Sequence, residues 1–279
     1  MISASRFLRC SVHSTYHTIE DGRVAVVRLT RDRARNALST QMCDTILKCT
    51  ADVSTPSSNV RAVIITGTET SFCAGKDLKA SLTHSPDQAK EYYAKTFGAV
   101  KALLRTPIPV IASIEKICLG LGLELALAAD LRVCGQSTQL GFPEIGLSLF
   151  PGCGGAVMLP ALLGNVSIAS DWILTGRRVS ATEARSVGVV NRVTEDGAAF
   201  NECLAIARQL MEKNRDLLIK TKRVVKHDFN SKVESDWMAV AEQLRLQVAQ
   251  HPDHLAALDK FSKYPTAHSR YGTRSLMKA

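Results

Sequence analysis

The sequence predicts an α/β fold, in which a layer of buried strands packs against helices. Short segments at residues 23–30, 60–66 and 110–114 have the apolar, β-branched composition of strands. Longer segments between them carry apolar residues at helical spacing. Buried strands that alternate with helices are typical of α/β layer architectures, and 279 residues suffice to bury such a core.

The elements alternate along the first half of the chain. In order, we expect a strand at 23–30, a helix from 39 or 40 to about 51, a strand at 60–66, a glycine turn at 71–78, a helix at about 87–104 and a strand at 110–114. Ser39 or Thr40 can cap the first helix, because a hydroxyl oxygen accepts a hydrogen bond from a first-turn amide. Two strand–glycine turn–helix units result, at 60–78 and 109–129.

Beyond Asp196 the pattern becomes purely helical. One apolar stripe at helical spacing consists of Cys203, Ile206, Ala207, Leu210 and Met211. We therefore divide the chain into an expected targeting segment at 1–19, an α/β core at 20–197 and a C-terminal helical domain at 198–279.

The first 19 residues have the composition of a cleavable mitochondrial presequence. They include Arg6, Arg9 and several serines and threonines, with no acid before Glu20. A short disordered tail is the alternative. No run approaches the roughly 20 apolar residues that a membrane span needs. We expect a protein of the mitochondrial matrix with no membrane partner.

Composition narrows the classes of ligand. The net charge of +9 favours a polyanionic partner, such as a phosphorylated small molecule, a nucleic acid or an acidic protein. The eight cysteines form no CxxC pair and lie mostly in apolar contexts, which indicates reduced core residues rather than disulfides or a metal site. The histidines show no metal-binding spacing, and neither a Walker P-loop nor a complete dinucleotide fingerprint is present. We expect no metal and no cofactor.

The stretch at 115–155 carries the candidate catalytic residues. Glu124 and Glu144 lie in a run that is otherwise almost wholly uncharged and apolar. A carboxylate in such surroundings must be paired, hydrogen-bonded or neutralised, and groups of this kind are candidates for acid/base catalysis. Each alone has a structural alternative: Glu124 as a first-turn helix acid, and Glu144 as one partner of a loop salt bridge.

Glycine turns supply a second feature of this candidate site. Gly120 and Gly122 precede a helix N-terminus, which presents unpaired amides. Gly75 allows a tight turn at which the amide of Lys76 can donate, although an ordinary strand-to-loop turn is the alternative. Two amides from two loops can hold one developing oxyanion. Such a clamp beside two carboxylates suits proton transfer next to a substrate carbonyl.

Four segments, in order, resemble the crotonase (enoyl-CoA hydratase/isomerase) superfamily: RARNAL at 33–38, FCAGKDL at 72–78, LGLGLELALAADLRV at 119–133 and FPEIGLSLFPGCGG at 142–155. The likeness spans about residues 20–265, and GLELALAADLRV most resembles the methylglutaconyl-CoA hydratase (AU-binding) branch. It implies a ClpP-like spiral of ββα units, a C-terminal helical part that forms trimers, often paired as hexamers, and acyl-CoA substrates without metal.

The resemblance also implies roles for individual residues. Glu124 would deprotonate the water that attacks the β carbon, and Glu144 would donate a proton to the α carbon. The backbone amides of Lys76 and Leu121 would form the oxyanion hole. Most relatives have glycine at the position of Leu121, a difference that bears on the acyl pocket because the donor is a backbone amide. Contacts to CoA are implied for Arg33, Arg35, Ala74, Lys76, Asp77 and Leu78, and for Lys260 or Lys263.

The implied activity is that of an enoyl-CoA hydratase, a lyase acting in fatty-acid β-oxidation or leucine degradation. Isomerases of the family usually keep only one of the two acids, so the pair favours a hydratase over an isomerase. A methylglutaconyl-CoA hydratase that also binds RNA is a further alternative. Residues 213–226 contain six Lys/Arg against one Asp, and they could contact phosphates or form a solvated helix face.

Overall fold

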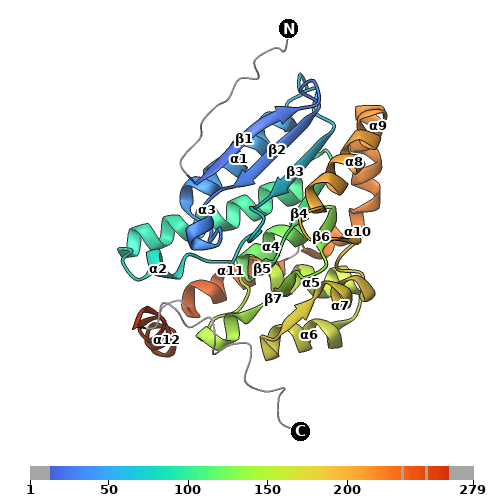
Figure 1. The fold of residues 1–279 in the computed structure, drawn as a ribbon. Coiled ribbons are helices and arrows are strands. Elements are labelled where there is room, and N and C mark those ends of the chain that lie inside the picture. The colour runs from blue at the N-terminus through green and yellow to red at the C-terminus, as the bar shows by residue number, and fades with distance from the viewer. Residues whose placement is uncertain (1–12, 234–235, 249–250, 264–279) are drawn as a thin grey trace.

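The protein forms two β-sheets surrounded by helices, seen in a computed structural model that describes residues 13–233, 236–248 and 251–263 (Figure 1). The larger sheet has the order β1-β2-β3-β4-β6-β9 and the smaller one β5-β7-β8. Neighbouring strands are parallel except for β1–β2 and β7–β8. The strands are β1 (Ser14–Ile19), β2 (Val24–Leu29), β3 (Ala62–Thr66), β4 (Val110–Ile114), β5 (Ile117–Leu119), β6 (Leu131–Gly135), β7 (Gln139–Gly141), β8 (Arg178–Ser180) and β9 (Arg192–Thr194).

Helices connect the strands and cover both sheets. They are η1 (Asp32–Ala34), α1 (Thr40–Ser54), α2 (Leu78–Ser81), α3 (Pro86–Arg105), α4 (Leu121–Ala128), η2 (Pro143–Leu147), α5 (Gly155–Leu163), α6 (Val166–Thr175), α7 (Ala181–Ser186), α8 (Ala199–Met211), α9 (Arg215–Val225), α10 (His227–Val233), α11 (Asp236–Val248) and α12 (Pro252–Lys263). The two early helices predicted from the sequence are confirmed as α1 and α3, and Ser39 caps α1 by accepting from the amide of Met42. None of the described helices is long and apolar enough to cross a membrane.

Both faces of the larger sheet are covered. Successive side chains along a strand point to opposite faces, so β2 contributes to two cores. Ala25 and Val27 join the main core with α1 and α3. Val24 and Val26 join a second cluster with α8, which packs against β3, β4 and β6. Figure 1 shows α8 on the side of the sheet away from α1 and α3.

Two contacts cross the domain boundaries predicted from the sequence, and the boundaries themselves stay predictions. The first helix of the predicted C-terminal helical domain, α8, packs against the larger sheet of the α/β core. The fold also begins before residue 20, because β1 pairs antiparallel with β2 from Ser14–Leu29 to Ile19–Val24. An edge strand tolerates polar residues, which is why this segment has the composition of a leader. The other residues of the expected targeting segment, 1–12, lie outside the described chain.

The basic segment at 213–226 is tied to the core. Lys222 and Lys226 form ion pairs with Asp130 at 2.6 and 3.3 Å. Arg215 donates to backbone carbonyls of α1 and of the loop before β3. Burial lowers the pKa of both lysines, while the charge of Asp130 acts in the opposite direction. These cations hold α9 in place, which favours a structural role for them over RNA contacts.

Candidate active site

Two glycine turns meet because their chain segments run parallel. Cys73 and Cys118 form a parallel β-bridge, and the amide of Leu119 donates to the carbonyl of Cys73 at 3.0 Å. Three residues beyond this bridge, the two segments reach Lys76 and Leu121. In a parallel pairing, equal steps along both chains keep residues side by side. This register therefore brings the amides of Lys76 and Leu121 together.

Gly75 permits the close approach of the two turns. Its φ is +108°, and a Cβ there would lie 2.9 Å from the carbonyl oxygen of Leu119 and 3.5 Å from the nitrogen of Leu121. Within the described chain, the amides of Lys76 and Leu121 have no hydrogen-bond acceptor. Leu121 also begins α4, so its N–H lies at the positive end of the helix dipole. Two donors thus remain available for a ligand oxygen.

Glu124 is buried in the first turn of α4. Its Oε1 accepts from the amides of Cys153 and Gly155, both at 2.8 Å, at the N-terminus of α5. Burial raises the pKa of Glu124 to about 7, whereas the Gly155 amide, the charge of Arg245 and the Cys153 amide act in the opposite direction. The carboxyl therefore changes its protonation state near neutral pH.

Glu144, in the 3₁₀ turn η2, packs directly against Gly120. A Cβ at Gly120 would lie 2.4 Å from Oε1 of Glu144, and Gly120 has a φ of +52°. The residue as a whole is partly exposed, but its Oε2 is buried and has no hydrogen-bond partner among the described residues. Burial, followed by the charge of Glu124, holds the pKa of Glu144 well above its usual range. Glu144 therefore favours its protonated form more strongly than an exposed glutamate does.

Both carboxyl groups line one cavity of about 50 Å³. Lys76, Leu121 and Phe150 contribute to the same walls. A cavity of this size holds a few water molecules. Two backbone donors and two carboxyl groups with raised pKa values therefore surround a small chamber in which water and a polarised carbonyl can react.

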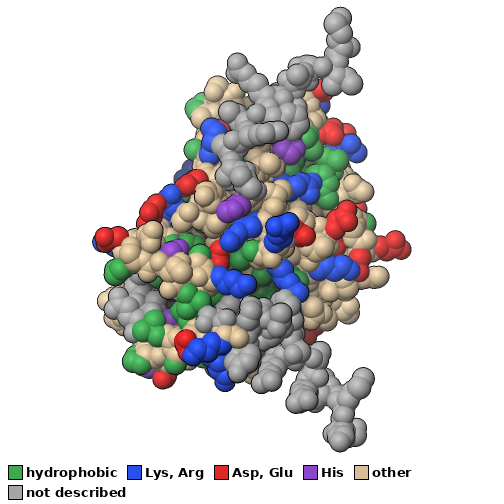
Figure 2. Space-filling view, turned by 60° about the vertical axis from the view of Figure 1, so that its left-hand side comes forward, with side chains coloured by type: hydrophobic (Ala, Val, Ile, Leu, Met, Phe, Trp, Pro, Cys, Tyr) green, Lys and Arg blue, Asp and Glu red, His purple; other side chains and the backbone are tan. Residues whose placement is uncertain are grey.

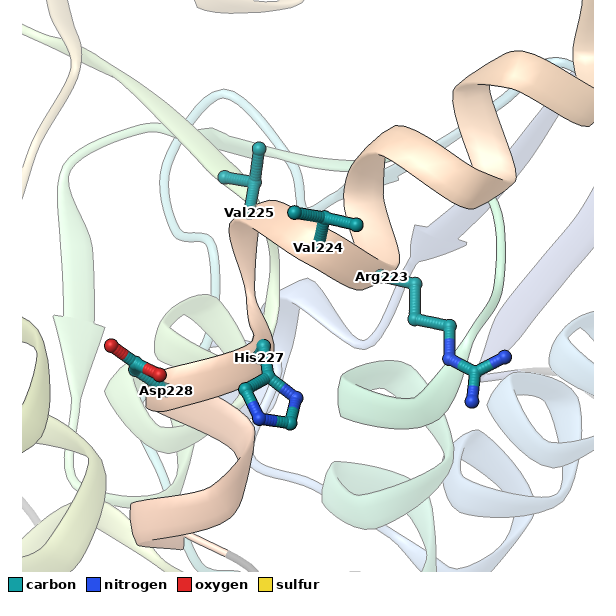
Figure 3. A pocket seen from close by; sticks show the side chains of 5 residues that line it. All are labelled: Arg223, Val224, Val225, His227 and Asp228. Carbon is teal, nitrogen blue, oxygen red and sulfur yellow. The ribbon is translucent and has the colours of Figure 1, made fainter.

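A larger hollow, of about 350 Å³, lies at the corner between α9 and α10 (Figure 3). It is lined by Arg223, Val224 and Val225 from the end of α9 and by His227 and Asp228 from α10. Asp228 is the one carboxylate among these five residues, and both valines are exposed. The paired acids and the converging amides place the candidate site in the smaller cavity instead.

Comparison with known proteins identifies the family of this chain. The sequence profile of the enoyl-CoA hydratase/isomerase family matches residues 20–263. The chain belongs to the enoyl-CoA hydratase/isomerase family. Its sequence is 42% identical over 182 residues to YngF of Bacillus subtilis (strain 168), named as an enoyl-CoA hydratase/isomerase; the match covers 65% of this chain and 69% of that protein.

Two further relatives cover more of this family member. It is 31% identical over 256 residues to the mitochondrial methylglutaconyl-CoA hydratase of Mus musculus, a match that covers 88% of this chain and 80% of the mouse protein. The crystal structure of an enoyl-CoA hydratase/isomerase from Xanthobacter autotrophicus Py2 superposes with a TM-score of 0.81 at 29% identity, over 90% of this chain and 93% of that one. The predicted crotonase fold is confirmed.

In this enoyl-CoA hydratase/isomerase family member, the residues expected to contact CoA separate into two groups. Arg33 is exposed on η1. The carbonyl of Arg35 accepts from the amide of Ala74 at 2.9 Å, so these two segments lie together. Arg178 of β8 lies close enough to Arg35 that its pKa is lowered, first by burial and then by that charge. Lys and Arg side chains gather in the middle of the face shown in Figure 2.

Three other residues expected to contact CoA take part in helices α2 and α12 or in their ion pairs. Asp77 pairs with Arg31, and its carboxylate accepts from the amide of Ala80 at 3.0 Å, which caps α2. Leu78 is the first residue of α2. Lys263 of α12 pairs with Asp259 at 2.5 Å. The CoA contacts of the family member stay predictions.

Several residues that line the cavity of this family member were not predicted from the sequence, among them Tyr93 of α3 and Arg245 of α11. Tyr93 stands at helical spacing with Phe97, Val100 and Leu104, a pattern that is typical of a helix face packed on the core. The sequence offers one indication for Arg245: it is an arginine that stands among apolar residues at helical spacing. Gly152 makes room for it, because a Cβ there would lie 2.6–2.8 Å from three carbons of the Arg245 side chain.

The cysteines and histidines contribute no further site in the described chain. Its seven cysteines are buried and free. Burial raises the pKa of Cys153, in the cavity wall, to about 12, so its thiol is a poor nucleophile. Among the described residues, no group of three or more His, Cys, Asp or Glu side chains is placed to hold a metal ion.

Proposed function

We propose that the protein is an enoyl-CoA hydratase, which adds water across the 2,3 double bond of a 2-enoyl-CoA thioester. The observation that carries this proposal is the difference between its two buried carboxyl groups. The pKa of Glu124 is about 7, whereas the pKa of Glu144 lies well above its usual range. A pair of carboxyls whose environments separate their protonation states is suited to act as base and acid.

In the proposed mechanism, the thioester oxygen accepts hydrogen bonds from the amides of Lys76 and Leu121. These donors stabilise the enolate that forms when water adds to the β carbon. Ionised Glu124 takes the proton of the attacking water, and neutral Glu144 delivers its own proton to the α carbon. The product is a 3-hydroxyacyl-CoA. A proton passed between the carboxyls through water restores the starting state.

The test follows loss of the ultraviolet absorbance of the conjugated enoyl thioester. Crotonyl-CoA is the substrate for wild type and for Glu124→Gln and Glu144→Gln. Each variant is expected to lose about 10²–10⁴-fold in kcat, the usual contribution of a positioned acid or base. If wild type hydrates no enoyl-CoA, or if Glu144→Gln is as fast as wild type, this proposal fails.

Glu115→Gln is the matched control. Glu115 is also a buried glutamate, and its Oε1 accepts from the amides of Gly197 and Ala199 at 3.0 and 3.1 Å, at the N-terminus of α8. This is the arrangement of Glu124 at α5, but outside the cavity. The control is expected to lose stability and to keep the wild-type kcat, which separates helix capping from catalysis.

An isomerase is the alternative within the family. A 3-enoyl-CoA substrate distinguishes the two, because isomerisation creates the conjugated chromophore that hydration destroys. Isomerisation needs one acid/base group, so an isomerase is expected to survive Glu124→Gln. Loss of all activity in both glutamine variants supports the hydratase.

We further propose a homotrimer or hexamer in the mitochondrial matrix, acting in fatty-acid or leucine oxidation. Exposed apolar residues on α9, Leu217, Val224 and Val225, support self-association through this helix. Light scattering coupled to gel filtration is expected to give three or six protomers, and Val225→Asp to reduce that number. Fluorescence imaging of a C-terminal fusion tests the location.

A further inference from the structure

The hydroxyl group of Tyr92, on α3, lies inside the backbone pairing that carries one of the two converging amides. Leu38 and Lys76 form a parallel β-bridge, in which the amide of Leu38 donates to the carbonyl of Gly75 at 2.9 Å. In a regular parallel pair, the carbonyl of Leu38 would accept directly from the amide of Asp77. Instead, the Tyr92 hydroxyl accepts from that amide at 3.1 Å and donates to that carbonyl at 3.0 Å. A side chain therefore bridges the two strands at this point.

The peptide units on both sides of Lys76 are held by these contacts. A peptide unit is planar, so the hydrogen bond to the Gly75 carbonyl sets the direction of the Lys76 N–H in the same unit. The next unit carries the amide of Asp77 and is held by Tyr92. Between the two contacts, the N–H of Lys76 has no acceptor in the described chain. Its direction is therefore determined by the groups that bind its neighbours.

Tyr92 is placed to act through the backbone and not on a substrate. It lines the same cavity as the two glutamates, but the residue is only 2% exposed. Burial raises the pKa of Tyr92 well above its usual range, so the hydroxyl keeps its proton. A hydroxyl has one proton to donate, and the carbonyl of Leu38 accepts it. None remains for a thioester oxygen.

We propose that Tyr92 is a positioning residue, whose hydroxyl aims the backbone amide of Lys76 at the thioester oxygen. Without this hydroxyl, the amide of Asp77 and the carbonyl of Leu38 would both lose a buried partner, which is costly. The two segments would then approach each other to form the direct hydrogen bond, and the peptide units at Lys76 would rotate. This inference rests on the proposed hydratase site, in which the Lys76 amide is one of two donors.

Hydration kinetics give the first test. Tyr92→Phe is expected to lower kcat for crotonyl-CoA by about 10–10²-fold with a smaller change in KM, because the donor is misdirected and not removed. Thr45→Val is the matched control. It removes a buried hydroxyl of α1 that is hydrogen-bonded to Ser14 at 2.8 Å and to the carbonyl of Gln41 at 3.1 Å, outside the cavity. The control is expected to lose stability and to keep the wild-type kcat.

Infrared spectroscopy of a bound thioester separates positioning from stability. Butyryl-CoA labelled with ¹³C at the thioester carbonyl is saturated and cannot be hydrated. Its carbonyl frequency is expected to fall on binding to wild type and to Thr45→Val, because two donors polarise the bond, and to fall less on binding to Tyr92→Phe. An equal fall in wild type and Tyr92→Phe would overturn the inference even if kcat decreases, since the hydroxyl would then act elsewhere.

The same spectra distinguish failure of this inference from failure of the hydratase proposal. If wild type hydrates no enoyl-CoA but shows the frequency difference from Tyr92→Phe, the hydratase proposal fails and the positioning role stands. If binding to wild type leaves the frequency unchanged, no donor is aimed at the thioester and the inference fails.

Hydrogen exchange resolved to single amides supplies a measurement on wild type alone, in case Tyr92→Phe does not fold. The amide of Asp77 is expected to be protected in the free protein, whereas the amide of Lys76 is expected to become protected only when butyryl-CoA binds. Fast exchange at Asp77 in the free protein would show that Tyr92 does not hold this segment, and would overturn the inference.

Discussion

The substitution Gly120→Ala tests whether close contact with the backbone at Gly120 holds the carboxyl group of Glu144 in place. The added methyl group would lie 2.4 Å from Oε1 of Glu144 and 3.1 Å from its carboxyl carbon. Ordinary contact begins at 3.4 Å, so the carboxyl group must withdraw by about 1 Å. A displacement of that size at a reacting group lowers the rate by about 10²-fold. The φ of +52° also disfavours alanine by about 1–3 kcal/mol.

The measurements are kcat for crotonyl-CoA hydration and the free energy of unfolding in urea. We expect kcat to fall about 10²-fold for Gly120→Ala, with a smaller change in KM. Gly188→Ala is the control for backbone strain, because Gly188 has a φ of +83° and no atom within 4 Å of an added Cβ. This control is expected to lose stability but to keep the wild-type kcat. In a Glu144→Gln background, Gly120→Ala should add little, since both changes act on one group.

Two outcomes would refute this reasoning. A folded Gly120→Ala variant with kcat within threefold of wild type would show that the contact does not position Glu144. An undiminished 10²-fold effect in the Glu144→Gln background would show that alanine acts through another group.

Three further predictions follow from the buried charges. The kcat/KM for crotonyl-CoA should rise with pH through about 7 as Glu124 ionises and fall at higher pH as Glu144 loses its proton, whereas a flat profile from pH 5 to 9 would contradict these roles. The folded pKa of Glu124 is raised from 4.5 to about 7, so folding favours its protonated form; the associated stability is complete below 4.5 and is lost as pH rises through 7. In urea unfolding, the free energy of unfolding of wild type should fall by up to about 3 kcal/mol between pH 5 and pH 8. Glu124→Gln should not show this fall, because glutamine does not titrate. Asp130→Asn should lower the free energy of unfolding by about 3 kcal/mol, because it leaves the mostly buried Lys222 and Lys226 without their anion; a loss below 1 kcal/mol would mean that α9 is held by its apolar contacts.

Local patterns in the sequence were sufficient for most of the core elements. α1 and α3 have serine caps and apolar stripes, and β3 and β4 are short buried runs. β1 was missed because an edge strand buries little: of its six residues, only Ser14 is fully buried. The sequence also contains an indication that a helix such as α8 covers the second face of the sheet. The run Val24–Val27 is apolar on both sides, which indicates a strand covered on both faces.

The site was predictable to the extent that it depends on backbone conformation. Gly75 and Gly120 mark conformations that few residues other than glycine adopt, and the sequence displays them directly. The contribution of Arg245 was not predictable, because it depends on how α11 lies over the loop at Gly152. No local pattern encodes that contact. It is set by tertiary packing of a helix more than 90 positions along the chain.

Because the segments at 73 and 118 run in parallel register, the backbone amides of Lys76 and Leu121 are positioned independently of their side chains. The electrophilic pocket is assembled from peptide groups, so its donors survive any substitution that preserves the chain path. The side chains of the same two residues are free to diverge. Both Lys76 and Leu121 also line the cavity. If these two amides bind the thioester oxygen as proposed, selectivity can change in evolution at the same residues without altering the chemistry.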